Sequence, residues 1–260
     1  MKKLIVLMAL LFASSLLQLV AQTICREVQR FHAENAVQGV AVDGKYFYAI
    51  QNTRISKYTI HGDSITTWTE PGSQSIFHLN SGVVIGHKMY CAHSNYPRVP
   101  MASSIEIFDT RTMQHLETVS LGIDVGSCTW VVPGKKCWYV FFAHYDKKAD
   151  ELDKDASWAQ LVQYDRKWRR LRAWILPPAL VKEVRPNSLS GGIYMNDTFY
   201  CTGHDAGKCY LLRIPSIGMM LEWNSTIEVP FEGQGLAVDP KGNLWGIERR
   251  NKTVIKSILE

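Results

Sequence analysis

The sequence QGVAVDGKYFYAIQ, residues 38–51, runs from a polar and a small residue through an apolar stretch, a turn and an aromatic-rich stretch to a polar end. The same order returns in residues 81–93, 126–144, 190–204 and 234–248. Short apolar or alternating runs separated by Gly, Asp, Asn and Pro predict strands joined by tight turns. A repeat period of about 40–50 residues is typical of propellers and related arrays.

Strand number and chain closure specify the architecture further. Each of the first four repeats continues with two more strand-like runs, and four strands make one propeller blade. The fifth repeat has three, over residues 234–238, 244–248 and 253–259, and residues 24–31 offer the missing strand. Pairing that strand with the last one would close the ring and remove two open edges. We therefore predict an all-β, five-bladed β-propeller whose N-terminal strand completes the last blade, with a β-sandwich as the main alternative.

The N-terminal segment has the pattern of an export signal. Lys2 and Lys3 precede an apolar stretch over residues 4–20, and Ala21 and Gln22 follow it. A basic start, a short apolar core and small residues near its end are typical of a secretory signal peptide, and a membrane anchor is the alternative. We expect a signal peptide over residues 1–22, a single propeller domain over residues 23–260, and a secreted or periplasmic protein without a membrane span after signal cleavage.

The charge pattern gives little support to a polyanionic partner. The formal net charge is +5, and removing Lys2 and Lys3 leaves 27 basic against 24 acidic residues, or +3. The densest basic run is RKWRRLR, residues 166–172, in which Leu171 alternates with arginines. This pattern favours a turn followed by the solvated face of a strand, so we expect no nucleic-acid partner.

The six cysteines permit disulfides in an exported chain. Cys201 and Cys209 flank a predicted hairpin turn, so a disulfide between them is one interpretation. The matching repeat positions of Cys91 and Cys201 favour the other, in which these residues are small buried apolar side chains. No Cys-x-x-Cys pair is present, and a structural zinc site is therefore not expected.

The repeats bring their polar ends to one end of the ring. In each blade the first two strands form a hairpin, so the start of the first strand lies beside the end of the second. The innermost strands also line the axis. We therefore expect a histidine-rich axial pocket formed by two sets of residues: Gln38, Ser81, Ser127, Ser190 and Gln234 with Gln51, His93, His144, His204 and Glu248.

Loops adjoining these positions add candidate binding residues. The expected substrate-binding set is Gln38, His78, Asn95, Tyr96, Trp130, Gln234, Glu248 and Arg249. The charged insertion over residues 146–157 is either a lid or a solvated surface loop. Polar loops on a rigid scaffold commonly carry binding and catalysis. An alternative for the recurring histidines is that each caps the same turn of its blade.

Two kinds of chemistry suit this set. Three neutral imidazoles, His93, His144 and His204, can hold zinc or another divalent metal with a position open for water or substrate. Without a metal, His144 or His204 would act as general base, with Asp146 or Asp205 as its orienting carboxylate. Arg249 would then hold an anionic group, and Tyr96 and Trp130 would stack on a sugar ring. The catalytic candidates are thus His93, His144, His204, Asp146 and Asp205.

The chain resembles a family of secreted bacterial propellers described as cycloisomerase-like or lactonase-like. The resemblance rests on short segments that span nearly the whole chain after residue 22: residues 38–43, 78–82, 91–97, 142–146, 202–205 and 230–235. It implies ring-opening or ring-forming chemistry on a small acid or lactone. It carries no assigned catalytic residue over to this sequence.

These observations lead to two hypotheses in different classes. The first is a lyase, isomerase or lactonase that acts on a small sugar-derived or carboxylate substrate. The second is a propeller without catalytic activity that binds a carbohydrate or a protein at the same end of the ring. No Gly-x-Ser-x-Gly, His-Glu-x-x-His or phosphate-binding Gly-rich motif decides between them.

Overall fold

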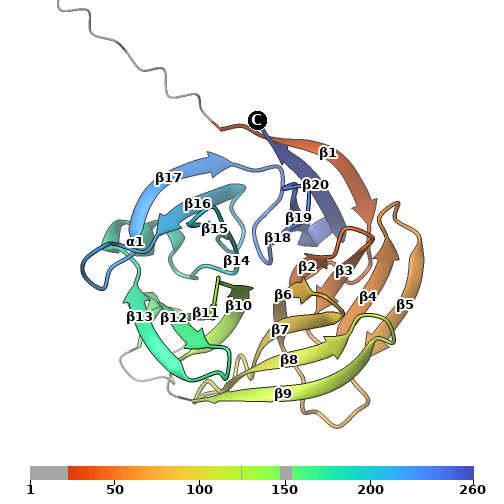
Figure 1. The fold of residues 1–260 in the computed structure, drawn as a ribbon, viewed down its shortest axis with the longest axis horizontal. Coiled ribbons are helices and arrows are strands. Elements are labelled where there is room, and N and C mark those ends of the chain that lie inside the picture. Colours follow the sequence, from red (N-terminus) through yellow and green to blue (C-terminus); the bar gives the residue numbers. More distant parts are fainter. Residues whose placement is uncertain (1–22, 124, 147–153) are drawn as a thin grey trace, which may run out of the picture.

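The computed structural model describes residues 23–123, 125–146 and 154–260, and the predicted signal peptide lies outside this range. Five four-stranded antiparallel sheets are arranged around a central axis as a five-bladed β-propeller (Figure 1). The predicted fold class is thereby confirmed. No helix in the described residues is long and apolar enough to cross a membrane.

The blades follow one another along the chain, and each begins next to the axis (Figure 1). The first consists of β2 (Gly39–Val42), β3 (Tyr46–Gln51), β4 (Arg54–Thr59) and β5 (Ser64–Thr69). The second consists of β6 (Leu79–Ile85), β7 (Lys88–Ser94), β8 (Ser103–Asp109) and β9 (Gln114–Gly122). The third consists of β10 (Ser127–Pro133), β11 (Cys137–Ala143), β12 (Gln160–Asp165) and β13 (Arg170–Ile175).

The last two blades complete the ring. The fourth consists of β14 (Gly191–Met195), β15 (Thr198–Thr202), β16 (Lys208–Arg213) and β17 (Glu222–Glu228). The fifth consists of β18 (Ala237–Val238), β19 (Leu244–Glu248), β20 (Thr253–Leu259) and β1 (Cys25–His32). Helical segments are short: α1 (Pro178–Val184), η1 (Ala156–Trp158) and η2 (Arg249–Asn251).

The N-terminal strand closes the ring as predicted. β1 pairs antiparallel with β20, from Cys25 opposite Leu259 to His32 opposite Thr253, with one register shift between Glu27 and Gln29. Phe31 of this strand is buried between the fifth and first blades. Its ring lies 5.8 Å from that of Trp245 in a stacked arrangement and 5.1 Å from that of Phe47. Closure therefore combines a hydrogen-bonded edge with an aromatic core.

Phe31→Ala is expected to lower the free energy of unfolding by about 3–5 kcal/mol, because it leaves a cavity between two aromatic rings. Urea denaturation at equilibrium measures this loss. Val28→Ala is the matched control, since Val28 is on the same strand and 43% exposed. A loss for Phe31→Ala no larger than that for Val28→Ala would contradict the assigned role of β1.

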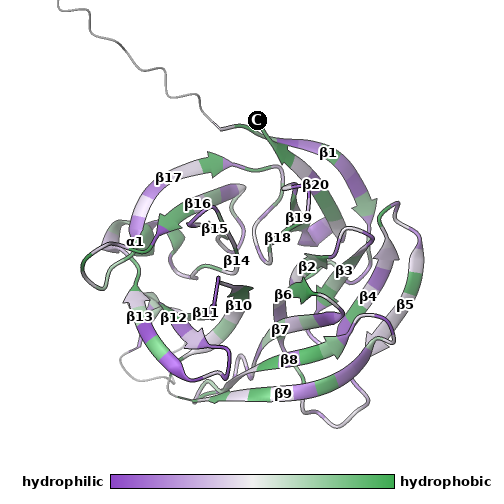
Figure 2. Ribbon diagram, in the orientation of Figure 1, coloured by the Kyte–Doolittle hydropathy of each residue, from purple (hydrophilic) through white to green (hydrophobic). Residues whose placement is uncertain are grey.

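Apolar clusters lie between successive blades, because both faces of a blade are covered by its neighbours. Figure 2 shows hydrophobic residues concentrated in the inner strands and hydrophilic ones toward the outer strands. Gly192 illustrates the close packing between the third and fourth blades. A Cβ atom there would approach the Trp130 ring to 2.7 Å, so only glycine fits.

Two further expectations can be checked on the blades. The basic run forms the turn between β12 and β13 and the exposed start of β13, as predicted. Cys201 and Cys209 lie on the adjacent strands β15 and β16, but Cys201 is opposite Tyr210 and Cys209 is opposite Thr202. The two thiols therefore point to opposite faces of the sheet. Both are buried and free, in agreement with the interpretation as small apolar residues.

Candidate functional site

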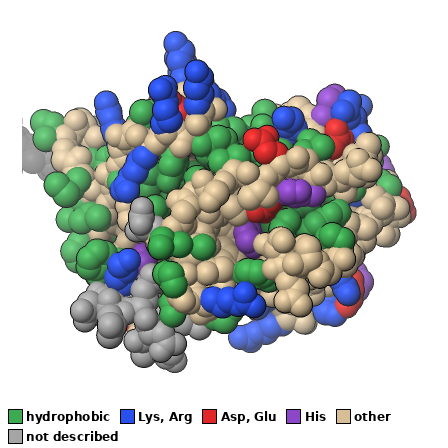
Figure 3. Space-filling model, turned by 90° about the horizontal axis from the view of Figure 1, so that it is seen from below, with side chains coloured by type: hydrophobic (Ala, Val, Ile, Leu, Met, Phe, Trp, Pro, Cys, Tyr) green, Lys and Arg blue, Asp and Glu red, His purple; other side chains and the backbone are tan. Residues whose placement is uncertain are grey.

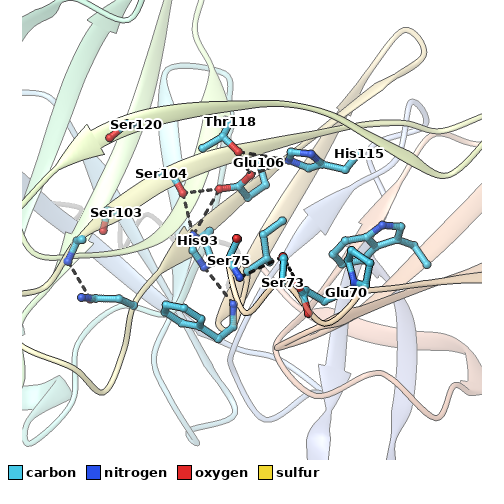
Figure 4. A pocket seen from close by; sticks show the side chains of 16 residues that line it. Glu70, Ser73, Ser75, His93, Ser103, Ser104, Glu106, His115, Thr118 and Ser120 are labelled. Carbon is cyan, nitrogen blue, oxygen red and sulfur yellow. Dashed lines mark hydrogen bonds and ion pairs between the residues drawn. The ribbon is translucent and has the colours of Figure 1, made fainter.

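A cavity of about 440 Å³ lies between the first and second blades, at the end of the ring where β7 finishes and β8 begins. Its walls are the segment that joins the two blades and one face of the second blade (Figure 4). The lining residues are Trp68, Glu70, Pro71, Ser73, Ser75, Ile76, Phe77, His93, Asn95, Ala102, Ser103, Ser104, Glu106, His115, Thr118 and Ser120. The volume suits one small molecule.

Strand register explains the polar face of this cavity. His93 of β7 is paired with Ser104 of β8, and Glu106 of β8 is paired with Thr118 of β9. Paired residues point to the same face of a sheet, and so do residues two apart on one strand. Farther along the same face, Cys91 and Phe108 belong to the apolar cluster between the blades. The cavity is thus polar toward the end of the ring and closed by apolar packing beneath.

Glu106 is the central polar group and is only 1% exposed. Its Oε1 accepts a hydrogen bond from the Ser104 hydroxyl at 2.5 Å, and its Oε2 accepts one from the Thr118 hydroxyl at 2.6 Å. His115 Nε2 lies 2.8 Å from the same Oε2. A buried carboxylate is expensive unless it is hydrogen-bonded, and three donors meet that requirement here (Figure 4).

Glu106 fixes the orientation and the tautomer of His115. An ionised carboxylate can only accept, so the His115 Nε2 carries the proton that forms this bond. The other ring nitrogen, Nδ1, is then the basic one, and it has no hydrogen-bond partner among the described residues. The ring also packs edge-on against Phe108, with centroids 5.2 Å apart. A carboxylate-held imidazole with a free second nitrogen is a general base set in place.

His93 has a different role from His115, because both of its ring nitrogens are used within the protein. Its Nε2 accepts a hydrogen bond from the backbone N–H of Phe77 at 3.3 Å. The proton is therefore on Nδ1, which donates to the Ser104 hydroxyl at 2.8 Å. Burial lowers the pKa of His93 despite the opposing effect of Glu106, and this keeps the ring neutral. His93 consequently positions Ser104 and Glu106.

The walls of the cavity combine aromatic and polar groups. Trp68 and Phe77 contribute ring surface, and serines and a threonine contribute hydroxyl groups. The Glu70 carboxylate is engaged by Ser73 and by the backbone N–H of Gly72, so it organises the connecting segment. Seen from the edge of the ring, histidine and acidic side chains lie close together among apolar and neutral ones (Figure 3).

A second group of candidate residues lies at the axial end of the ring. His204 Nδ1 is 2.5 Å from an Asp205 oxygen, and its Nε2 is 3.4 Å from Arg249 Nη1. Gln234 donates from Nε2 to the His204 backbone oxygen at 2.9 Å, and Gln38 donates to Asn52 Oδ1 at 2.7 Å. The expected partnership of His204 with Asp205 is thus present in the geometry, with Arg249 beside it.

Three other candidates, His144, Trp130 and Asp146, are held by contacts within the protein. His144 is 1% exposed, and its Nε2 lies 3.2 Å from the Val125 backbone oxygen. Trp130 is 1% exposed and stacks on Phe141, so neither face of its ring is open to a sugar. Asp146 does not orient His144: its carboxylate accepts from the Ala156 N–H and lies 3.6 Å from Arg185 Nε.

The remaining four candidates contact loops or the closing strand. Glu248 accepts from Arg30 of β1 at 2.8 Å, so it faces the closing strand. Asn95 lines the cavity but also bridges the loop after β7, donating to the Pro100 oxygen and accepting from the Ala102 N–H, both at 2.8 Å. The Tyr96 ring packs on His78, with centroids 5.0 Å apart, and on Tyr145 at 5.2 Å.

The three histidines that the sequence offers as metal ligands are not arranged to bind one metal ion. His93 has both nitrogens engaged, His144 is directed at a backbone oxygen, and His204 lies between Asp205 and Arg249. Across residues 23–123, 125–146 and 154–260, no group of three or more His, Cys, Asp or Glu side chains is placed to hold a metal ion.

His78 makes stability depend on pH. Burial, followed by the fields of His93 and Arg249, lowers its pKa from 6.5 to about 4. Between these values the unfolded chain binds a proton that the folded protein does not, so stability falls as pH falls from about 6.5 to about 4. The full contribution is on the order of 3 kcal/mol. Urea denaturation should show a smaller acid-side loss for His78→Asn than for the unmodified protein, and equal losses would contradict this assignment.

Sequence reasoning missed Glu106 and His115. It considered only the ends of the first two strands in each blade, whereas these residues lie on the third and fourth strands of the second blade. A signal was present in residues 104–108, SIEIF, where Ser104 and Glu106 share a face with Phe108. Because a blade is covered on both sides, a glutamate in such a strand must be buried and needs partners.

Comparisons with known proteins agree with the fold. No family model and no curated protein matches the sequence. Among solved structures, the chain is similar to glutaminyl cyclase of Myxococcus xanthus, with a TM-score of 0.60 and 10% identity over 92% of this chain and 97% of that one.

Two further solved structures are similar over most of this chain. A luciferin-regenerating enzyme has a TM-score of 0.54 and 9% identity, covering 91% of this chain and 95% of that one. A protein of unknown function from Bacteroides thetaiotaomicron has a TM-score of 0.51 and 11% identity, covering 88% and 70%. At such identities the likeness shows a shared fold and assigns no residue.

Proposed function

We propose that the protein is an enzyme that performs acid–base chemistry on a small molecule in the cavity between the first and second blades. The observation that carries this proposal is the buried Glu106, which holds His115 on the cavity wall with Nδ1 unpaired. The two enzymes among the similar structures are compatible with a catalytic propeller. Positioned general bases of this kind contribute about 10²–10⁴-fold to a rate.

The reaction class is a lyase, isomerase or lactonase reaction on a sugar-derived or carboxylate substrate. His115 Nδ1 would take a proton from an acidic C–H or a hydroxyl group, and the resulting imidazolium would return it to the leaving oxygen or to a neighbouring carbon. Glu106 stabilises the imidazolium during this transfer. The proton balance closes within the substrate for an isomerisation or elimination, and a lactonase reaction would add one water.

The lining of the cavity supports a ring-shaped, hydroxylated substrate. Trp68 and Phe77 offer apolar surface for a ring, and Ser75 and Ser120 offer hydroxyls for its polar edge. The resemblance to cycloisomerase-like and lactonase-like propellers supports the same substrate class. The basic start and apolar stretch of residues 1–20 support export, so we place the reaction outside the cytoplasm.

A carbohydrate-binding protein without turnover is the second candidate. The aromatic and hydroxyl groups of the cavity favour it, since sugars are commonly held by such pairs. The two functions differ in one observable. An enzyme converts its ligand, whereas a binding protein releases it unchanged.

The test is incubation of the purified protein with a panel of aldonolactones, uronic acids and neutral monosaccharides, followed by NMR spectroscopy and mass spectrometry. We expect the unmodified protein to convert at least one compound. The His115→Asn variant should convert that compound at least about 100-fold more slowly. His61→Asn is the matched control, because His61 is an exposed histidine outside the cavity. Saturable calorimetric binding without any product would instead support the binding protein, and equal rates for His115→Asn and His61→Asn would refute the catalytic assignment.

A further inference from the structure

An apolar surface lies at the outer edge of the third and fourth blades, outside the catalytic cavity. It is formed by large side chains from the end of β13 and from the loop between β16 and β17. Ile217 is 91% exposed and Met219 is 68% exposed, and Met220 and Ile175 are exposed beside them. Single exposed apolar side chains are common on proteins, but a group of them marks an interaction site. We call these four residues the apolar edge.

The backbone of the apolar edge is held by hydrogen bonds between the two blades. The Ile175 N–H donates to the Met219 oxygen at 2.9 Å, and the Leu221 N–H donates to the Ile175 oxygen at 3.0 Å. Ile175 and Met220 thereby form a parallel bridge. Leu221 is buried in the apolar cluster between these blades. The apolar side chains are therefore presented to solvent by a fixed backbone.

The basic run of residues 166–172, RKWRRLR, forms the turn that leads into β13 and the start of that strand. It contains five cations, and all five are exposed. Among the residues that the structure describes, only Arg169 of these five has a carboxylate partner, Asp165 at 2.7 Å. The net charge of the whole chain is small, so the positive charge is concentrated at this turn.

The basic run and the apolar edge adjoin one another. Arg172 lines a surface hollow together with Ile214 and Gly218 of the loop between β16 and β17. Arg172 and Ile175 are also separated by only about 10 Å along β13. A further exposed cation, Lys182 of α1, lines a groove with Ile175. In Figure 3, hydrophobic side chains gather toward the left edge of the molecule, and Lys and Arg side chains rise beside them.

This combination favours a lipid bilayer over a folded partner. Ile217 protrudes from its loop, so it can enter a soft apolar phase without needing a matching pocket. Peripheral proteins bind bilayers through apolar side chains at the acyl boundary and through cations that attract anionic headgroups. Arginine side chains also pair well with phosphate oxygens. The charge of the basic run is thus complementary to an anionic membrane surface.

We propose that the apolar edge and the basic run bind the surface of an anionic phospholipid bilayer. Ile217 and Met219 enter the acyl boundary, and the cations of residues 166–172 contact lipid phosphates. This surface is separate from the Glu106–His115 cavity and does not depend on the reaction proposed there. It assigns to the protein a peripheral position on a membrane.

The experiment is cosedimentation with vesicles of phosphatidylcholine and phosphatidylglycerol in equal parts, and with vesicles of phosphatidylcholine alone. The chain that begins at Thr23 is used, because it contains all five blades and because the apolar residues 4–20 would bind a bilayer by themselves. We expect saturable binding to the mixed vesicles that weakens with added salt, and much weaker binding to phosphatidylcholine.

Two double variants separate the apolar and the electrostatic contributions. Ile217→Ser with Met219→Ser should lower the partition coefficient on mixed vesicles by about tenfold or more, because the inserted apolar surface is lost. Lys167→Gln with Arg172→Gln should lower it by about tenfold or more, since each cation near an anionic surface contributes about fivefold.

Each double variant has a matched control elsewhere on the ring. Ile65→Ser with Leu116→Ser removes two exposed apolar side chains from the outer strands β5 and β9. Lys45→Gln with Lys241→Gln removes two exposed cations from turns of the first and fifth blades. We expect both controls to bind mixed vesicles like the unmodified chain, and thermal denaturation to show all variants folded.

Three results would overturn the proposal. The first is the absence of binding to mixed vesicles, and the second is equal binding by a double variant and its control. The third is a concentration-dependent dimer that Ile217→Ser with Met219→Ser abolishes, which would assign the apolar edge to a second copy of the chain. The readout requires no turnover, so failure here leaves the catalytic cavity untouched.

Discussion

Glu106→Gln is expected to lower kcat by about 100-fold or more on whichever compound the protein converts, with KM changed by no more than about threefold. The amide retains the shape of the carboxylate, and its oxygen can still accept from His115 Nε2. The negative charge that stabilises the imidazolium during proton transfer is lost. Steady-state kinetics with separate kcat and KM values measures this effect.

The control for this change is Glu117→Gln, on the adjacent strand β9. Glu117 is exposed and is paired with Ile107, so it points away from the cavity face. We expect kcat for Glu117→Gln to equal that of the unmodified protein, and thermal denaturation to show both variants folded. A folded Glu106→Gln protein with unchanged kcat would refute the role of Glu106 as positioning residue for His115.

Deletion of residues 23–32 is expected to abolish the cooperative folding of the monomer. The deletion removes the whole of β1, exposes the edge of β20, and takes Phe31 from its place between Trp245 and Phe47. An open edge with a vacated aromatic core favours association with other chains. Circular dichroism during thermal denaturation, together with size-exclusion chromatography, measures the loss.

A chain that begins at Thr23 is the control for this deletion, because it retains β1. A synthetic peptide of residues 23–34 added to the truncated protein should restore part of the cooperative transition, since the pairing with β20 is intermolecular in that mixture. A truncated protein that is monomeric and unfolds with the same midpoint as the control would contradict closure of the ring by β1.

The fold could be predicted because the sequence pattern that specifies a blade occurs five times. Each blade carries the same sequence of apolar runs and turns, so errors in one repeat are corrected by the others. The three-stranded fifth repeat and the unpaired run near Cys25 together required closure, and β1 and β20 pair accordingly. The Gly, Asp, Asn and Pro residues between the apolar runs also indicated the turns, and in the structure the carboxylates of Asp43 and Asp239 accept from backbone N–H groups two residues on.

The site was harder to predict because a repeat position specifies the end of a strand and leaves the direction of the side chain open. His93 and His144 occupy related positions, yet one faces Ser104 in the cavity and the other is directed at the Val125 oxygen. The sequence predicts that Trp130 stacks on a sugar ring, whereas its ring fills the space above Gly192. The register of β10 against β11 also shifts between Cys128 and Trp130, and a repeat pattern does not reveal such a shift.

The repeat pattern also does not predict which buried residues contact a catalytic candidate, because it locates only the ends of the inner strands. Glu106 and His115 are brought together by the pairing of β8 with β9, including a register shift between Ile107 and Phe108. No local pattern reveals which residues of two strands come into contact across such a shift. The His204–Asp205 pair was accessible from the sequence because its members are adjacent in the chain.

The tautomer of His115 tests the account most directly. Two-bond ¹H–¹⁵N correlation spectroscopy of the intact protein, with assignment by comparison with His115→Asn, reports which ring nitrogen carries the proton. We predict a His115 ring protonated at Nε2 and unprotonated at Nδ1, with the Nδ1 resonance changing when a converted compound is added. Protonation at Nδ1, or the averaged pattern of a freely exchanging surface histidine, would contradict the Glu106–His115 pair as the base in the cavity.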